Sequence, residues 1–399
     1  MSSQIADRAA THFSNLGHVL THMVTILYAT AVLHLPSVFG LPYGEMLGFA
    51  SLGLVLYGVA ALPAGWLGDR WSQIGMMVVF FLGIGGASVL VGVAKGTNEV
   101  FIGLTLIGLF ASIYHPVGIA WLIANAKKQG MTLGVNGLFG GMGSALAAPF
   151  VGMMIDFFSW RLAFILPGII SILAGIALLI CWRRGQIHDV KSDRIATARP
   201  SANAMKRAFF VLTLTMACAG FVYAGLTNTM PKLFEEGLAQ YVSSYTQLGL
   251  YVGAVLALSS LSGILGGWLA DRFSPRAIYI GFWTLTIAPL FFIPTAVGAA
   301  LLSLVIAALF LNTGFVAAEN MLVARYTPFK WRSLAYGSKF VLALGVGGLT
   351  VKVAGDLFDA TGSFTQLYVM LGAAAACATA AALLLPSEPA TELHEEPAT

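Results

Sequence analysis

The sequence contains little charge. Only 10% of its 399 residues are Asp, Glu, Lys or Arg, whereas 58% are hydrophobic. A water-soluble chain is about 25% charged, so this one cannot cover its surface with groups that water solvates. The scarcity of charge therefore excludes an ordinary soluble protein and predicts a chain that lies in a lipid bilayer.

Several chemical motifs are also scarce or absent. The three cysteines, Cys181, Cys218 and Cys377, lie far apart in apolar stretches, which predicts neither a disulfide framework nor a metal site. The sequence has no nucleotide-binding loop and no nucleophile elbow. We therefore expect no enzyme activity, no cofactor, no bound metal and no nucleic-acid partner. An N-x-S/T sequon is missing too, which favours a bacterial protein.

Long apolar runs account for most of the chain. A helix needs about 20 mostly apolar residues to cross the hydrocarbon layer. Twelve such stretches can be placed, at about 15–35, 46–68, 74–94, 100–124, 131–155, 162–182, 208–230, 245–270, 277–295, 299–322, 334–358 and 364–385. The sequence therefore predicts an all-α, polytopic membrane protein with twelve transmembrane helices.

Basic residues are concentrated in alternate loops. Most of the 21 Lys and Arg fall in the N-terminal segment and in the loops on the same side, above all in the segment 183–207. Cytoplasmic loops carry an excess of Lys and Arg, so we expect a cell inner membrane protein with both termini cytoplasmic. The acidic, proline-containing tail 387–399 is predicted to be disordered.

The two halves of the chain share a motif. The octapeptide GWLGDRWS, from Gly65 to Ser72, recurs as GWLADRFS from Gly267 to Ser274. A weaker echo links 134–156, which ends on Asp156, to 337–359, which ends on Asp359. Such self-similarity indicates a duplicated structural unit. We predict two pseudo-symmetric six-helix bundles, 1–182 and 208–386, joined by the basic cytoplasmic linker 183–207.

These motifs resemble those of the major facilitator superfamily, and the resemblance covers essentially the whole chain. G-x-x-x-D-R occurs between the second and third helix of each half, and Trp160-Arg161-x-x-Phe164 begins the sixth span. The resemblance implies a cytoplasmic gate formed by Gly65, Asp69, Arg70, Gly267, Asp271 and Arg272. The alternative is that the Asp–Arg pairs only mark tight turns. The first copy also lacks the further basic residues that usually follow this motif in the family.

The gate has a physical basis. A carboxylate close to a helix N-terminus is stabilised by the helix dipole. We expect Asp69 to face the start of the eleventh helix, near Ser333, and Asp271 to face the start of the fifth, near Thr132. Each contact would join the two halves at the cytoplasmic end.

A finer resemblance concerns histidines. His18-x-x-x-His22, with Tyr114-His115-Pro116, is similar to the branch that contains fosmidomycin-resistance efflux proteins. The family's antiporter motif in the fifth helix is degenerate here and supports export only feebly. Pro149 and Gly152 fit it, but three expected glycines are replaced, by Val135, Ser144 and Ala148.

Polar side chains inside the spans are candidates for transport chemistry, because their insertion into a membrane is costly. His18 and His22 share a helical face, and His115 lies in the fourth span beside Tyr114. In family members the first and fourth helices line the cavity, so the three histidines are expected to converge there and take up protons. The alternative is that each histidine only hydrogen-bonds a neighbouring helix.

A second candidate group contains charges. Glu319 lies well inside the tenth span, and Lys339 lies at similar depth in the eleventh. Because an unpaired charge there would be costly, we predict an ion pair between them, either fixed and structural or controlled by a proton or substrate. Asn136 is the repeat-related counterpart of Lys339, which places it in the pathway as well. Asn312 is a further candidate.

Together these features predict a secondary active transporter, monomeric, that moves a small organic solute by alternating access. The leading hypothesis is proton-coupled efflux, since no ATP site is present. One alternative is uptake of an organic anion that Lys339 and the histidines attract. Divalent-metal export through the histidines lacks supporting Cys, Asp or Glu at ligand spacing. A non-transporting membrane sensor would have no reason to keep the intramembrane charges.

Overall fold

The chain folds into a bundle of helices. The computed structural model describes residues 2–126, 129–189, 202–327 and 337–387, and these residues contain no β-strand. The first half comprises α1 (Ser2–Ala31), α2 (Leu35–Phe39), α3 (Tyr43–Gly48), α4 (Ser51–Val59), α5 (Ala61–Arg70), α6 (Gln73–Val93), α7 (Thr97–Ala111), the π-helix η1 (Tyr114–Gly118), α8 (Ile119–Ala124), α9 (Gln129–Phe157) and α10 (Leu162–Arg183).

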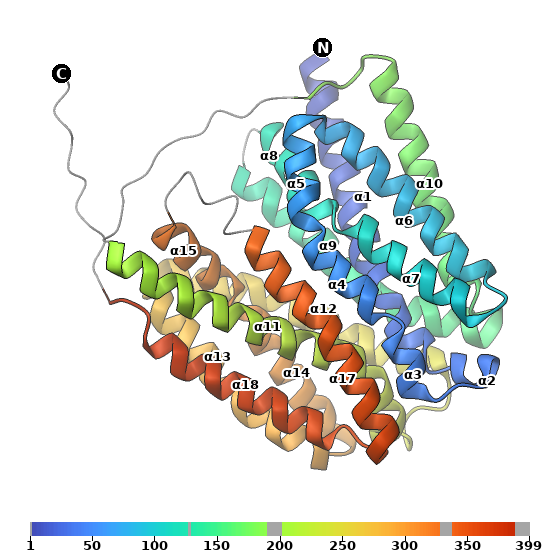
Figure 1. Ribbon diagram of the computed structural model, residues 1–399, viewed down its shortest axis with the longest axis vertical. Coiled ribbons are helices and arrows are strands. Elements are labelled where there is room, and N and C mark those ends of the chain that lie inside the picture. Colours follow the sequence, from blue (N-terminus) through green and yellow to red (C-terminus); the bar gives the residue numbers. More distant parts are fainter. Residues whose placement is uncertain (1, 127–128, 190–201, 328–336, 388–399) are drawn as a thin grey trace.

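The second half follows the same plan. It comprises α11 (Ala202–Gly237), α12 (Tyr245–Arg272), α13 (Pro275–Phe292), the 3-10 helix η2 (Ile293–Thr295), α14 (Gly298–Gly314), α15 (Val316–Tyr326), the π-helix η4 (Val341–Gly345), α17 (Val346–Thr361) and α18 (Thr365–Leu383). In Figure 1 the helices of each half lie together, and α1 begins at the same end of the molecule at which α10 finishes.

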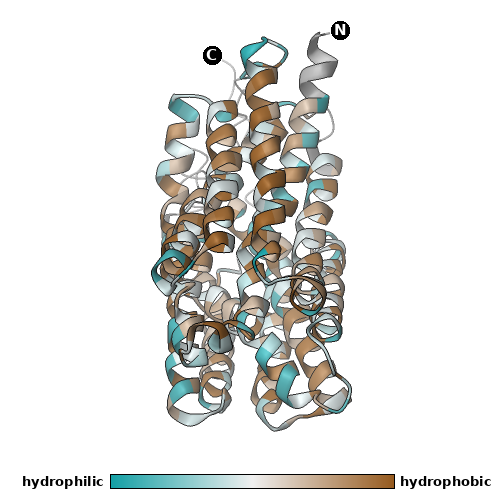
Figure 2. Ribbon diagram, turned by 90° about the vertical axis from the view of Figure 1, so that its right-hand side faces the viewer, coloured by the Kyte–Doolittle hydropathy of each residue, from teal (hydrophilic) through white to brown (hydrophobic). Residues whose placement is uncertain are grey.

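Twelve segments have the length of a membrane span. Within the described residues, ten helical segments are long and apolar enough to cross a membrane, and the bent pair Tyr43–Val59 and Ala61–Arg70 makes an eleventh. The twelfth is α1, which is 30 residues long but carries histidine, asparagine and threonine side chains that lower its hydropathy. Figure 2 shows hydrophobic residues along most of the helices. The predicted all-α, membrane-spanning fold is confirmed.

Several predicted boundaries differ from the structure. The first helix begins at Ser2 instead of about residue 15, because the polar residues before the apolar run also adopt helical geometry. The second span is broken at Ala60, with a bend of 40° between its two parts. Residues 202–207 of the predicted linker already belong to α11. Linker residues 190–201 and tail residues 388–399 lie outside the described part of the chain.

Most helix packing occurs within each half. In the first half α1 packs on α9, and α6 packs on α10 and α7; in the second, α18 packs on α11 and α13, and α12 packs on α14. Other helix pairs cross between the halves, among them α1 with α11. The α9 helix packs on α12, α3 and α4 pack on α17, and α4 also contacts η4. These crossing helices line the space between the halves.

The two ends of the bundle need separate names. We call the end at which α1 begins the terminal end; α5 and α12 finish there, at Arg70 and Arg272. The opposite end is the distal end, where α9 and α17 finish and where α3 and α12 begin. A solute that crosses the membrane between the two halves has to pass both ends.

Candidate functional site

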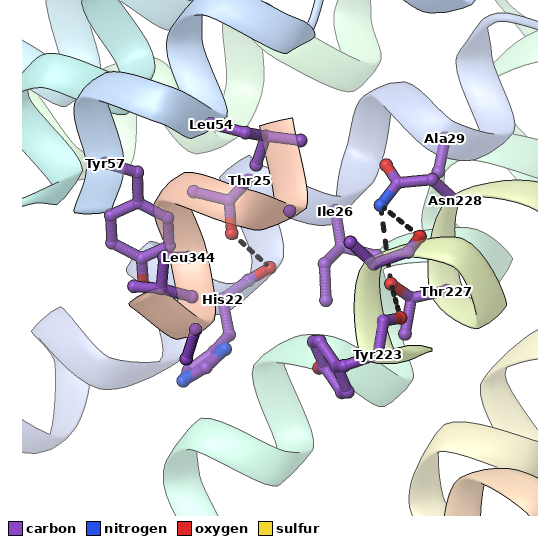
Figure 3. A pocket seen from close by; sticks show the side chains of 13 residues that line it. His22, Thr25, Ile26, Ala29, Leu54, Tyr57, Tyr223, Thr227, Asn228 and Leu344 are labelled. Carbon is purple, nitrogen blue, oxygen red and sulfur yellow. Dashed lines mark hydrogen bonds between the residues drawn. The ribbon is translucent and has the colours of Figure 1, made fainter. Parts of the chain in front are cut away.

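Two cavities adjoin at the centre of the bundle. The larger, of about 350 Å³, is lined by α1, α9, α11, α12, α14 and α15, and the smaller, of about 60 Å³, by α1, α4, α11, η4 and α17. His22 and Tyr223 line both cavities. Figure 3 shows these two side chains together at one edge of the smaller cavity. They therefore stand at the boundary between the two spaces.

The cavity walls offer hydrogen-bonding groups without charge. No Asp, Glu, Lys or Arg is among the described residues that line either cavity. In the smaller cavity, Asn228 Nδ2 donates to the Ala224 carbonyl (3.0 Å) and makes a longer hydrogen bond to Thr227 Oγ1 (3.4 Å). The Tyr223 hydroxyl forms no hydrogen bond with any residue that the structure describes. A bound solute would meet these groups first.

Three histidines meet beside the larger cavity. One ring nitrogen from each of His18, His22 and His115 lies within 4.8 Å of the others. The His18 and His22 Nε2 atoms are 3.2 Å apart, and His115 Nε2 is 3.0 Å from the Tyr57 hydroxyl. The predicted convergence is confirmed as a geometric fact. The π-helix η1 causes it, because the Pro116 ring cannot donate an N–H and the helix widens at that point.

Asn136 ties the histidines to the rest of the first half. Its backbone carbonyl is 2.7 Å from His18 Nδ1, and its Nδ2 donates to Asn15 Oδ1 and to the Tyr114 hydroxyl, both at 3.0 Å. The Tyr114 hydroxyl in turn donates to the Ser14 carbonyl (2.8 Å). Asn136 and Tyr114 are almost completely buried. Both were predicted to belong to the pathway; the structure places them one layer behind the cavity, where they orient His18.

The second half contains the predicted ion pair. Lys339 Nζ lies 2.6 Å from Glu319 Oε1 and also donates to Asn320 Oδ1 (2.7 Å). The Tyr279 hydroxyl donates to Glu319 Oε2 (2.9 Å). Glu319 is 2% exposed, so its contacts with Lys339 and Tyr279 offset part of the free-energy cost of burying its charge. Val316, three residues before Glu319 in α15, lines the larger cavity, whereas Glu319 and Lys339 are not among its lining residues.

Asn312, the remaining predicted pathway residue, contacts neither the histidines nor the Glu319–Lys339 pair. Asn312 in α14 is buried, and its Nδ2 has no hydrogen-bond partner among the described residues. It joins neither the histidine group nor the ion pair. The structure therefore brings seven of the eight predicted pathway residues into two groups and leaves Asn312 outside both.

The predicted gate residues lie at the terminal end. Arg70 stacks over the Trp66 ring at 4.7 Å, and Arg272 stacks over Trp268 at 4.0 Å, so the two copies of the motif make the same contact. Gly65 lies against Pro116, where an added Cβ would be 3.1 Å from the proline Cβ. Gly267 has more room, with Ala317 at 4.0 Å.

The gate carboxylates are not engaged in this structure. Asp69 and Asp271 are exposed, and neither forms a hydrogen bond or an ion pair with a described residue. The expected contact of Asp271 with the start of α9, near Thr132, is not formed. The expected partner region of Asp69, near Ser333, lies outside the described residues. Closure of the terminal end by these groups stays a prediction.

At the distal end, by contrast, carboxylates join the two halves. Asp156, at the end of α9, accepts hydrogen bonds from the Tyr245 and Thr246 backbone N–H groups (3.2 and 2.7 Å) at the start of α12. Asp359, near the end of α17, accepts from the Gly44 and Glu45 backbone N–H groups (2.7 and 2.8 Å) in α3. Each carboxylate caps a helix of the other half.

Glycines let the backbones touch at this end. A Cβ on Gly44 would lie 2.0 Å from the Gly355 carbonyl oxygen, and one on Gly152 would lie 2.1 Å from the Tyr245 carbonyl oxygen. Toward the terminal end, a Cβ on Gly134, Gly137 or Gly263 would meet no described atom within 4 Å. The distal end is therefore closed, and the halves separate toward the terminal end.

Some of these residues escaped the sequence analysis. Tyr57 and Tyr279 had no local signal, because each is a single polar residue in an apolar run, and Asn15 lies in the polar stretch that precedes the first apolar run. Asp156 and Asp359 did have one, since the weaker echo between the halves ends on an aspartate in both copies. A shared terminal carboxylate indicated a shared contact, but only the fold shows what each one binds.

Comparisons with known proteins agree with this architecture. The family model of the Major Facilitator Superfamily matches residues 15–338. The D-galactonate transporter of Escherichia coli is 24% identical over 395 residues, covering 90% of each chain. The 4-hydroxybenzoate transporter of Pseudomonas aeruginosa is 23% identical over 382 residues, covering 86% of this chain and 83% of its own.

A solved structure shares the fold. A bacterial homolog of the human lysosomal transporter Spinster, in an inward-facing and occupied conformation, superposes with a TM-score of 0.68 at 15% identity, covering 95% of this chain and 93% of its own. The family match extends over most of the sequence, and the paired halves around a central cavity are what a carrier requires. The chain belongs to the Major Facilitator Superfamily and is a multi-pass membrane transporter.

Proposed function

We propose that this transporter imports a small organic anion together with a proton. The observation that carries the proposal is the buried Glu319–Lys339 pair, whose Glu319 follows the cavity-lining Val316 by three residues in α15. The relatives named above transport galactonate and 4-hydroxybenzoate, which are carboxylates. The predicted orientation makes the terminal end cytoplasmic, so the structure corresponds to an inward-facing state in an inner membrane.

The two cavities suit an anion because no carboxylate is among their described lining residues. His22 and Tyr223 offer polar groups to both cavities, and Asn228 offers its amide to the smaller one. Hydrogen bonds to a charged acceptor are stronger than those to a neutral one, so the free Tyr223 hydroxyl and the Asn228 amide favour a carboxylate. We expect the carboxylate to bind close to these groups.

Glu319 and Lys339 provide a means of coupling. While Glu319 is ionised, it neutralises Lys339 at 2.6 Å. A proton on Glu319 would remove that negative charge and leave the Lys339 ammonium to attract the anion. Proton and anion then favour each other's binding, and reciprocity of binding free energies requires the same effect in both directions. The solute and the proton would cross together.

The same argument favours import over efflux. In an antiporter the proton and the substrate compete for one state of the carrier, whereas here they would cooperate. Cooperation favours symport, which an inward proton gradient drives as import. Proton-coupled efflux, and the similarity of the histidines to the fosmidomycin-resistance branch, remain the competing prediction.

The test uses the purified protein in proteoliposomes with an imposed pH gradient and a panel of radiolabelled carboxylates. We expect accumulation when the outside is acidic, and an apparent affinity that improves as the pH on the substrate side falls. Glu319→Gln should abolish gradient-driven accumulation but leave exchange of labelled for unlabelled substrate partly intact. A variant that exchanges substrate but does not accumulate it is folded and has lost proton coupling, whereas a misfolded variant would do neither.

Asp356→Asn supplies the matched control. Asp356 also pairs with a lysine, Lys352 at 2.5 Å, but both side chains are more than half exposed. An exposed pair contributes little, so this variant should keep full proton-driven transport. If Glu319→Gln also keeps it, the pair is structural and the coupling proposal is wrong. Accumulation driven by an acidic interior would instead establish efflux.

A further inference from the structure

We propose that His18, His22 and His115 bind one divalent transition-metal ion of the Zn²⁺, Ni²⁺ or Co²⁺ class. The sequence argued against a metal site because it holds no thiol or carboxylate at ligand spacing. The fold changes that argument, since it adds His115 from η1 to the pair on α1. The proposal goes beyond transport and does not depend on which solute is carried.

The spacing of the first two ligands already fits a metal. Zinc binds imidazole nitrogen at 2.0–2.1 Å, so two ligands on a tetrahedral ion are about 3.3 Å apart. The His18 and His22 Nε2 atoms are separated by 3.2 Å. Two histidines four residues apart on one helix are also the pair that many zinc enzymes use. The third nitrogen, within 4.8 Å of both, needs only a side-chain adjustment.

The outer hydrogen bonds orient the ligands. His18 Nδ1 lies 2.7 Å from the Asn136 carbonyl oxygen, which can only accept, so Nδ1 carries the proton. The His18 Nε2 lone pair then points toward His22. Metal-binding histidines commonly donate their other N–H to a backbone carbonyl, as His18 does here. Since Asn136 is 1% exposed, this arrangement is fixed by packing.

The donor set selects the class of ion. Three neutral imidazoles suit Zn²⁺, Ni²⁺, Co²⁺ and Cu²⁺, whereas Mg²⁺ and Ca²⁺ prefer oxygen ligands. His18 and His22 also line the 350 Å³ cavity. Water or an anion from that cavity can occupy the fourth position and offset the charge of the ion. An imidazole cluster that only held helices together would not need this access.

Binding can be measured on the full chain in detergent, without an affinity tag, using Co²⁺ as the probe. We expect one Co²⁺ per chain, with the intense visible absorption of a tetrahedral site, and displacement by Zn²⁺. Loss of an outer-shell partner weakens metal binding 10- to 100-fold, so loss of a ligand in His22→Gln or His115→Gln should weaken it by at least about 100-fold. Both variants remove one ligand each from different helices.

His34→Gln is the control. His34 lies outside the cluster and makes an edge-to-face contact with the Tyr245 ring, with the ring centroids 5.9 Å apart, so its loss should leave Co²⁺ binding unchanged. The proposal is wrong if the unaltered chain binds no Co²⁺, or if folded His22→Gln and His115→Gln variants bind it as tightly as the His34→Gln variant does. Monodisperse elution in gel filtration verifies folding, and the unaltered chain alone already provides a test should one variant misfold.

Discussion

The two ends of the bundle use related carboxylates in opposite ways. At the distal end Asp156 and Asp359 each cap a helix of the other half, with distances of 2.7–3.2 Å. At the terminal end Asp69 and Asp271 are exposed and have no partner among the described residues. All four lie close to a helix end that faces the gap between the halves. A carrier that alternates cannot close both ends firmly at once, so one set of contacts has to be open.

The comparison also shows how tightly each end is packed. The distal end depends on glycines that allow backbone contact, such as Gly44 against Gly355. Toward the terminal end a side chain makes the contact between the halves, since a Cβ on Gly337 would lie 2.4 Å from Leu62 Cδ2. Closure of an end thus requires glycines, which let the backbones approach, and carboxylates, which accept hydrogen bonds from the free N–H groups at a helix N-terminus. Substitution of a glycine should disturb closure most, and substitution of a carboxylate should disturb it less.

Gly44→Ala should have the largest effect. Its Cβ would lie 2.0 Å from the Gly355 oxygen, a distance that no real Cβ contact tolerates, so the distal end cannot close. We expect the distal end to stay open and transport to fall to background. Spin labels at the exposed positions Val38 and Val297 would report the opening as a longer distance in pulsed electron paramagnetic resonance.

Gly86→Ala is the matched control for this change. A Cβ there would meet no atom within 4 Å, so the label distances and the transport rate should match those of the unaltered protein. Unchanged label distances in Gly44→Ala would show that the backbones part readily and that packing does not hold this end closed.

Asp359→Ala and Asp156→Ala should have intermediate effects. Loss of an N-cap carboxylate costs about 1 kcal/mol, or roughly a fivefold change in population. Each variant should therefore shift the balance toward the open distal end, and the double variant should add the two effects if the sites are independent. The fraction of long label distances measures the shift. Equal fractions in all four proteins would show that these bonds are incidental.

Asp271→Asn should have the smallest effect, with the opposite sign. Asp271 has no described partner in this structure, so its loss should not alter this state, but it should weaken closure of the terminal end in the other state. We expect a two- to threefold shift, about the size of an exposed helix-dipole interaction, toward the conformation seen here. Combined with Asp359→Ala, it should partly restore the original balance. A shift toward the open distal end would contradict the gate assignment.

Much of the fold was predictable. Apolar run length located the spans, and α10 (Leu162–Arg183) and α12 (Tyr245–Arg272) lie within two residues of expectation. The break in the second span at Ala60 did have a signal that hydropathy ignores, because Pro63 has no N–H to donate to the Val59 carbonyl and a proline inside a helix kinks it at that point. Polar residues at the start of α1 also concealed its length. Hydropathy measures the preference for lipid and says little about local geometry.

The candidate site was predictable in composition and only partly in arrangement. Because insertion cost marks each buried polar residue, the histidines, Asn136, Glu319 and Lys339 could be selected from the sequence. The pairing of Glu319 with Lys339 followed from their similar depth. The Tyr279 hydroxyl on Glu319 and the Asn136 carbonyl on His18 did not follow, since backbone carbonyls carry no residue type and helix rotation decides which side chains face each other.

The sequence by itself determined that this protein spans a membrane, that an octapeptide recurs in its two halves and that its spans contain a few costly polar groups. Those properties are local sums over the chain, or repeats along it. Only the tertiary structure decided that three histidines share one site and that Asp359 caps a helix 315 residues away. It also decided which end is closed, because closure depends on backbones that approach within a few ångströms, and such approach is a property of packed helices rather than of any segment alone.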